Sequence, residues 1–151
     1  MMCSLSCAST TDKAKGIAND STTVVESPAD SLHITLAMTG DIMMGTTFPT
    51  TQLPANDGAD LFRDAEPILQ RADLAVGNLE GTLCDDGTST KGTGPNSYAF
   101  RTPTSYAPWL KKAGYDFLSM ANNHANDFGL TGIESSERCL TEQGILFSGI
   151  E

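Results

Sequence analysis

Two short segments of the sequence carry oxygen-bearing side chains that could bind a metal ion. Asp41 follows a glycine, and Asn78 and Glu80 lie two residues apart, so they share one face if the segment is a strand. Carboxylate and amide oxygens suit hard or borderline divalent ions such as Mg²⁺ and Mn²⁺. Simpler explanations stay open for both segments. A Gly-Asp turn forms for local hydrogen-bonding reasons, and Asn78 with Glu80 can be a turn residue beside a solvated acid.

The densest polar cluster is the third one, Asn122-Asn123-His124-Ala125-Asn126-Asp127. Three amides, an imidazole and a carboxylate are costly to bury unless they bind a ligand or close a hydrogen-bonded network. His124 is suited to proton transfer or to stabilising charge on a transferring group. Asp127 is the nearest side chain that could orient its ring. The alternative is that His124 only ties down its loop through backbone hydrogen bonds.

Alternating strands and helices must position these clusters. Apolar or β-branched runs predict strands, and helical periodicity with capping residues predicts helices. The predicted strands are 33–39, 73–77, 115–120 and 145–148, and the predicted helices are 61–71, 104–112 and 131–144. Pro67 limits the first helix, which begins either at 61 or near Asp64. A capping box of Thr131 and Glu134 is expected to open the last helix. A Gly- and Thr-rich stretch predicts a loop at 85–96.

This alternation favours an α/β fold whose sequential strands are largely parallel. In such sheets, functional sites form beyond the carboxyl ends of the strands. Each of the three polar clusters comes directly after a predicted strand. The order of the elements therefore supports a site at these strand ends.

Composition limits the classes of partner. The chain has 151 residues, enough for one domain with a core, and a formal net charge of −10. Nucleic-acid binding draws on clustered Lys and Arg, and Lys111-Lys112 is the only adjacent basic pair, so nucleic acid is excluded as a partner. A polyanionic substrate would be repelled unless a bound cation inverted the local field. No apolar run approaches the roughly 20 residues that a membrane-spanning helix needs.

Residues 1–31 differ in composition from the rest of the chain. This difference predicts an amino-terminal tail that tethers a domain at residues 32–151. The segment around Cys7 resembles the end of a bacterial lipoprotein signal, in which a lipid is attached to a cysteine. Ser, Thr, Asp, Lys and Ala then dominate, which is typical of a flexible tether. This interpretation places the protein at the bacterial cell envelope, anchored through Cys7. The alternatives are an incidental cysteine in a trimmed end and a cytoplasmic location.

The remaining cysteines indicate neither a zinc site nor a disulfide framework. The sequence has no Cys-x-x-Cys pair and no histidine at zinc-finger spacing from a cysteine. Cys84 and Cys139 are expected to be small core or surface residues.

Taken together, the clusters resemble the successive motifs of the CapA family of capsule and poly-γ-glutamate synthesis proteins. The matching segments are Gly40-Asp41-Ile42-Met43-Met44-Gly45, Gly77-Asn78-Leu79-Glu80-Gly81, Tyr98-Ala99-Phe100-Arg101-Thr102-Pro103 and Ala121-Asn122-Asn123-His124-Ala125-Asn126-Asp127-Phe128-Gly129. They occur in the family's order. The resemblance implies the calcineurin-like metallophosphatase superfamily, with a two-sheet β-sandwich flanked by helices. This chain would supply its N-terminal half, as β-α-β-α-β-α-β.

The resemblance also implies roles for individual residues around two divalent metal ions, which could be Mn, Zn, Fe or Mg. Asp41 matches the aspartate ligand of the first motif. Asn123 matches the asparagine ligand of the third motif, and His124 matches its neighbouring catalytic histidine. The bridging ligand is either Asn78 or Glu80, and Glu80 is favoured because two bridged cations need negative charge.

The sequence departs from the superfamily pattern at two places. Met43 stands where a histidine ligand is usual, and a thioether is a poor ligand for hard cations. The later histidine motifs do not occur in these 151 residues. We therefore expect a truncated chain, inactive as a fragment and a metal-dependent hydrolase only at full length.

Two classes of function follow from the resemblance. The first is metal-dependent hydrolysis or transfer at a phosphate ester or related bond, with a phosphate ester or an anionic capsule polymer as substrate. The second is a non-catalytic component of capsule polymer assembly or anchoring at the cell surface. Metal content together with phosphodiesterase turnover would separate them.

Overall fold

The computed structural model describes residues 33–92, 94 and 96–149. The predicted tail at 1–31, with Cys7, lies outside the described residues. The main sheet has four parallel strands in the order β1-β2-β5-β6. Their bounds are β1 Leu36–Ile42, β2 Leu74–Leu79, β5 Phe117–Ser119 and β6 Leu146–Ser148. This confirms the α/β prediction with sequential parallel strands.

Strands β1 and β2 reach further toward their carboxyl ends than the sequence predicted. Asp41 and Asn78 were expected to follow strands, but both lie inside them and pair with each other across the sheet. The register shifts between Met38 and Asp41, which is a bulge in β1. Parallel pairing resumes beyond this bulge and carries the strand through Gly40, the expected turn.

The helices are shorter or begin earlier than predicted. They are α1 Glu66–Leu69, α2 Ala107–Ala113 and α3 Gly129–Glu142, with 3-10 turns η1 Ala55–Gly58 and η2 Thr104–Tyr106. The helix expected at 61–71 is only one turn, because Pro67 occupies its first turn and lacks the N–H that would continue a helix from earlier residues. Gly114 ends α2 in a left-handed conformation, with φ of 107°, as predicted.

The expected capping box of α3 is wrong. The helix begins at Gly129 after Phe128, so Thr131 and Glu134 lie inside it. The amide of Gly132 already donates to the carbonyl of Phe128 at 3.3 Å. Helical hydrogen bonding therefore continues from the turn that precedes the helix and starts before Thr131 can act as a cap.

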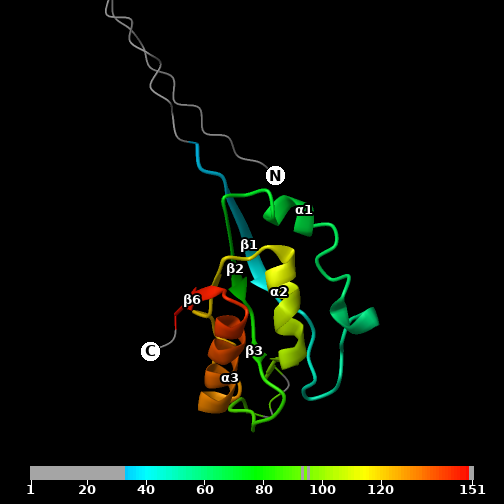
Figure 1. Ribbon diagram of the computed structural model, residues 1–151. Coiled ribbons are helices and arrows are strands. Elements are labelled where there is room, and N and C mark those ends of the chain that lie inside the picture. The colour runs from blue at the N-terminus through cyan, green and yellow to red at the C-terminus, as the bar shows by residue number, and fades with distance from the viewer. Residues whose placement is uncertain (1–32, 93, 95, 150–151) are drawn as a thin grey trace, which may run out of the picture. The chain divides into compact units, whose positions relative to one another are not determined.

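One face of the sheet and the helices form the main core. Ala75, Leu79 and Leu118 on the strands pack in one cluster with Leu110 of α2 and Leu140 of α3, and each is at most 2% exposed. Each fully buried leucine stabilises the fold by about 1.5–3 kcal/mol. Figure 1 shows α2 in front of the carboxyl end of β1, and α3 next to α2 and beside β3, below β6. The helices cover this face and hold the strand ends in register.

The opposite face of the sheet is apolar and open. Met38, Val76, Phe117 and Leu146 form a row across all four strands, because each is in register with the next. Met38 is 72% and Leu146 is 70% exposed. Contiguous exposed apolar patches usually mark a contact surface. Such a face fits a sheet that packs on a second sheet, as in the metallophosphatase sandwich.

A second, two-stranded parallel sheet fixes both ends of the predicted loop at 85–96. It consists of β3 Thr82–Leu83 and β4 Arg101–Thr102. The hydroxyl of Ser136 in α3 accepts a 2.9 Å hydrogen bond from the amide of Leu83. The loop therefore begins beside α3, and its end pairs with β3 next to the turn that carries His124. Cys84, at its start, and Cys139 are buried free thiols, within the expectation for both.

Within the described ranges, no helix is long and apolar enough to cross a bilayer.

Candidate functional site

Asn78 is the centre of a polar network at the carboxyl ends of β1 and β2. Its Nδ2 donates to Asp41 Oδ1 at 2.7 Å and to Glu80 Oε2 at 3.0 Å. The pairing of Asp41 with Asn78 across the strands explains this closeness. The structure thus brings the first two predicted clusters together around one amide.

Asn122 joins the third cluster to this network. Its Nδ2 donates to Asn78 Oδ1 at 3.0 Å and to the carbonyl of Leu79 at 2.8 Å. Its Oδ1 accepts a 2.9 Å hydrogen bond from the amide of His124. Every polar atom of this side chain is therefore used, so Asn122 fixes the turn on which His124 sits.

Asn123, the predicted ligand, points differently from its neighbour. It is exposed, and its backbone carbonyl accepts a 2.8 Å hydrogen bond from Lys91 Nζ. Successive side chains diverge, so only one of the two asparagines can face Asn78. Sequence reasoning selected Asn123 from the family motif and assigned no role to Asn122, although both stand in the same polar cluster.

His124 lies between two carboxylates and is 9% exposed. Its Nδ1 is 2.8 Å from Asp127 Oδ2, and its Nε2 is 3.6 Å from Glu80 Oε1. The ring also packs on Phe100, with centroids 4.4 Å apart. Since the carboxylate accepts from Nδ1–H, the other ring nitrogen faces Glu80 and the rest of the network. The predicted orienting role of Asp127 has the contact that it requires.

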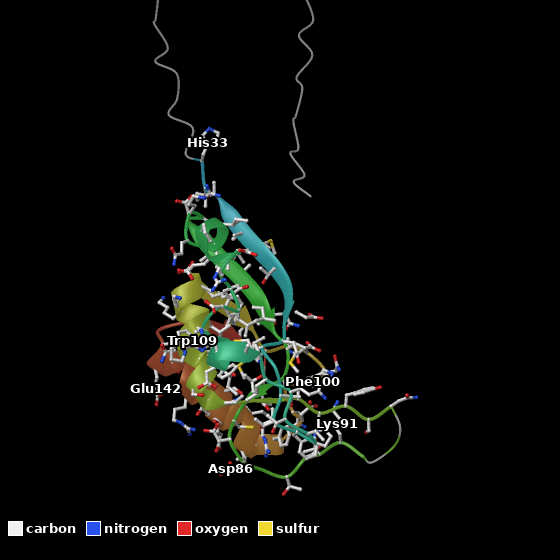
Figure 2. The ribbon with its side chains drawn as sticks, turned by 90° about the vertical axis from the view of Figure 1, so that its right-hand side faces the viewer. His33, Asp86, Lys91, Phe100, Trp109 and Glu142 are labelled. Carbon is white, nitrogen blue, oxygen red and sulfur yellow. The ribbon has the colours of Figure 1, made fainter. Side chains whose placement is uncertain are left out.

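Asp127 is fully buried and holds the loop as well as the histidine. Its Oδ2 also accepts a 2.7 Å hydrogen bond from the amide of Phe100. Its Oδ1 has no partner with hydrogen-bond geometry, but Lys91 Nζ lies 3.3 Å away. A buried carboxylate is costly unless a positive charge compensates it. Lys91 supplies that charge from the loop that carries it (Figure 2).

The carboxylates of Asp41 and Glu80, with the amide of Asn78 between them, fit part of a divalent-metal site. Two carboxylates lie near one neutral amide group, which does not compensate their charge, whereas a cation would. In the part of the chain that the structure describes, no three His, Cys, Asp or Glu side chains are grouped so as to hold a metal ion. The described residues therefore supply oxygen donors for an incomplete coordination shell.

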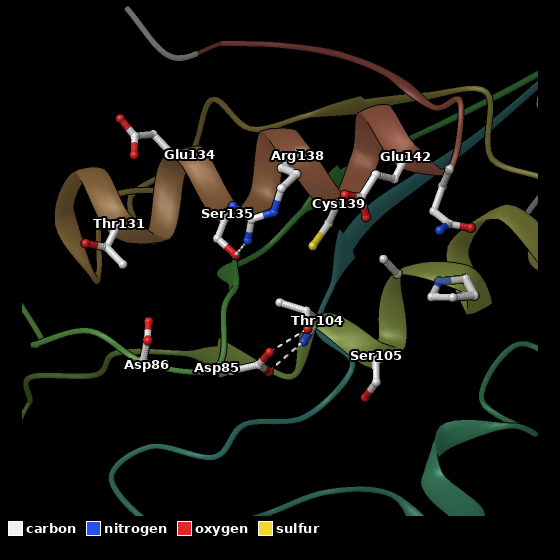
Figure 3. Close-up of a pocket in the computed structure, with 13 residues that line it drawn as sticks. Asp85, Asp86, Thr104, Ser105, Thr131, Glu134, Ser135, Arg138, Cys139 and Glu142 are labelled. Atoms are coloured by element: carbon white, nitrogen blue, oxygen red, sulfur yellow. Dashed lines mark hydrogen bonds between the residues drawn. The ribbon is translucent and has the colours of Figure 1, made fainter.

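A separate groove lies along α3 and contains none of the predicted site residues. It has a volume of about 590 Å³, and its lining includes Asp85, Asp86, Glu134, Glu142 and Arg138 (Figure 3). Its four carboxylates are spread over the helix and the opposite segment. This surface, the acidic groove, is chemically distinct from the network around Asn78.

Comparison with known proteins gives one family. The model of the family described as "Bacterial capsule synthesis protein PGA_cap" matches residues 35–151. The chain is similar to the uncharacterized protein y4sH of Sinorhizobium fredii, with 31% identity over 77% of this chain and 24% of that protein.

Two relatives have descriptive names. The capsule biosynthesis protein CapA of Bacillus anthracis is 26% identical over 77% of this chain and 28% of its own length. The PGA biosynthesis protein CapA of Bacillus subtilis is 28% identical over 68% of this chain and 26% of its own length. The chain thus spans about a quarter of the length of the curated relatives it matches.

The match covers all the described strands and helices and all three polar clusters. It confirms the resemblance found in the motifs, and the family implies the metallophosphatase superfamily. The chain belongs to the bacterial capsule synthesis protein PGA_cap family, to which its CapA relatives point as well.

Proposed function

We propose that the full-length protein is a metal-dependent enzyme of capsule biosynthesis that hydrolyses or transfers a phosphate ester or a related bond. One observation carries the proposal. Asp41, Asn78, Glu80, Asn122 and His124, from three separate segments, form one connected polar network at the strand ends. The names of the two CapA relatives support the setting, and the lipoprotein-like segment around Cys7 supports a place at the cell envelope.

Asp41 and Glu80 are the residues that would hold the metal, with Asn78 between them. A divalent ion supplies Lewis acidity, which polarises a phosphoryl oxygen and makes water more acidic. Asn78 donates its amide hydrogens to both carboxylates, so the negative charge in this part of the site comes from Asp41 and Glu80. This arrangement supports Glu80, rather than Asn78, as the charged bridging ligand.

His124 is the residue that would move a proton. The buried carboxylate of Asp127 orients the imidazole through Nδ1, while Nε2 faces the network. From this position Nε2 can donate a hydrogen bond to an oxyanion or a proton to a leaving oxygen. Phe100 covers the ring and keeps water from one side of it.

The test is a joint measurement of metal content and turnover in the full-length protein. We expect bound Mn²⁺, Zn²⁺ or Fe after dialysis, together with hydrolysis of bis(p-nitrophenyl) phosphate. Asp41→Asn should lower both, because it removes a negative charge that a neutral amide does not replace. Neither metal nor turnover in the wild-type protein would reject the enzyme and favour a non-catalytic component of capsule polymer assembly.

A further inference from the structure

A pocket beside the site is lined by basic residues, although the chain as a whole is acidic. It has a volume of about 770 Å³, and its wall includes Phe48, Gly87, Ser89, Lys91, Ser97 and Arg101. Among the described residues that line it, two are cationic and none is acidic, whereas the whole chain carries a net charge of −10. A cleft lined by one sign of charge concentrates ligands of the opposite sign. We call this surface the basic pocket.

Arg101 is held in the basic pocket by aromatic rings and by two hydrogen bonds of its guanidinium. Its Cζ lies 5.2 Å from the ring centroid of Phe128 and 5.7 Å from that of Phe48. Its Nε donates to Thr47 Oγ1 at 3.0 Å, and its Nη1 to the carbonyl of Gly87 at 3.5 Å. These contacts use two of the five N–H donors. A guanidinium fixed in this way is pre-organised for bidentate contact with an oxyanion.

Lys91 lies between the basic pocket and the turn that carries His124. Its ammonium is 3.3 Å from Asp127 Oδ1 and 2.8 Å from the carbonyl of Asn123, and its side chain is 31% exposed. The same cation therefore lines the pocket and touches the carboxylate that orients His124. A ligand group in the pocket would lie within reach of the proposed reacting centre.

We propose that the basic pocket binds an oxyanion, a carboxylate or phosphate group, on the molecule whose bond the neighbouring site acts upon. The reaction part of this statement rests on the proposed function, but the binding part does not. Arg101 supplies paired donors and a positive charge, and the hydroxyls of Ser89 and Ser97 complete a polar wall. Lys91, whose charge also balances Asp127, supplies a further N–H donor. The acidic groove, with four carboxylates and one arginine, lacks this chemistry and serves as the internal contrast.

The experiment is an NMR titration of the ¹⁵N-labelled chain in EDTA, with inorganic phosphate in one arm and glutarate in the other. Shifts of the Gly87 and Ser89 amides are expected, with saturation, in at least one arm. Binding in only one arm supports the proposal and identifies the group. The absence of saturable shifts at these amides in both arms overturns it, and this readout needs no variant to fold.

Variants then test the two cations. Arg101→Gln and Lys91→Gln should each weaken binding about tenfold or more, the size of one lost charge-assisted hydrogen bond. Lys111→Ala removes the same charge from an exposed position on α2 and should leave the affinity unchanged. An equal loss in Lys111→Ala would show a non-specific charge effect and overturn the proposal. Thermal unfolding of each variant checks that the fold is intact.

Asp41→Asn separates this inference from the proposed function. Asp41 lies outside the basic pocket, so this variant should bind the oxyanion as the wild type does, whatever it does to metal and turnover. Metal-dependent turnover without oxyanion binding would reject the pocket alone. Oxyanion binding without metal or turnover would reject the enzyme alone.

Discussion

The imidazole Nδ1 of His124 lies 2.8 Å from Oδ2 of Asp127, a carboxylate with no exposed surface. A carboxylate in this position fixes which ring nitrogen carries the proton and which faces the ligand. The same oxygen accepts the amide of Phe100, so the orientation of the ring and the path of the preceding loop depend on one buried atom.

Removing this imidazole should impair turnover more than structure. We expect His124→Ala in the full-length protein to lower turnover about 10²–10⁴-fold, the usual contribution of a positioned acid or base. Metal content should be retained, because His124 is not among the proposed ligands. Steady-state kinetics and metal analysis measure the two effects. His33→Ala, at an exposed position before β1, is the control. Full activity in His124→Ala would show that this residue only stabilises its loop.

The two adjacent asparagines should differ in what they stabilise. Asn122→Ala removes hydrogen bonds to Asn78, Leu79 and His124, and should lower the free energy of unfolding by about 1–3 kcal/mol. Asn123→Ala changes an exposed side chain and should leave stability within about 0.5 kcal/mol of the wild type. If Asn123 is the metal ligand that the motif implies, its variant should lose metal affinity at full stability. Denaturant unfolding and calorimetry on both variants decide between the roles.

Gly77 should not tolerate a side chain. A Cβ there would lie 2.5 Å from Thr39 Oγ1 and 2.6 Å from Ile42 Cδ1. Gly77→Ala should therefore cost about 1–3 kcal/mol of stability through overpacking. Gly40→Ala is the matched control on the neighbouring strand, since a Cβ at Gly40 meets nothing within 4 Å. Equal unfolding midpoints for the two variants would contradict the close packing of β1 on β2.

The contact between Thr35 and Asp73 should appear as a pH effect. The Thr35 hydroxyl and then its backbone amide, both donating to Asp73, lower the pKa of this carboxyl below its ordinary value of 3.8. The resulting stabilisation is fully present above the ordinary pKa and is lost as the pH falls through the lowered one. Thr35→Val removes the hydroxyl donor, so NMR titration should find the pKa of Asp73 closer to 3.8. An unchanged titration curve would contradict this cause.

The open apolar face should bind a hydrophobic dye. In the 151-residue chain, we expect 8-anilinonaphthalene-1-sulfonate fluorescence that falls in Met38→Lys and Leu146→Lys, whose parent side chains are 72% and 70% exposed. Ile68→Lys changes a 60% exposed side chain on α1, away from this row, and should leave the fluorescence unchanged. An equal decrease in all three variants would show that the dye senses net charge instead.

The architecture could be predicted because its signals are local. The alternation of apolar strand-like runs with helical segments indicated the parallel strands. A glycine at position 114 indicated the end of α2. The start of α3 could not be predicted from Thr131 and Glu134, because the backbone turn after His124 already runs into the helix. Asp41 was assigned to a turn since the pairing that extends β1 depends on β2, which lies over thirty residues later.

The candidate site was predictable in its residue types and less so in its contacts. Spacing and motif order selected Asp41, Asn78, Glu80 and His124, and the structure connects them. Lys91 could not be found in this way. It reaches Asn123 across 32 positions, from a loop whose Gly-rich sequence carries no signal for where it folds.

The strands of the main sheet lie side by side in the order in which they occur along the chain. Each strand can therefore add to the free edge left by the one before it, and no later strand has to insert between two that have already paired. This order suits folding during synthesis, when the amino-terminal part leaves the ribosome first. Asp41, Asn78 and Glu80 lie on or directly after the first two strands, so the acidic part of the site precedes the turn that carries His124 in the order of synthesis.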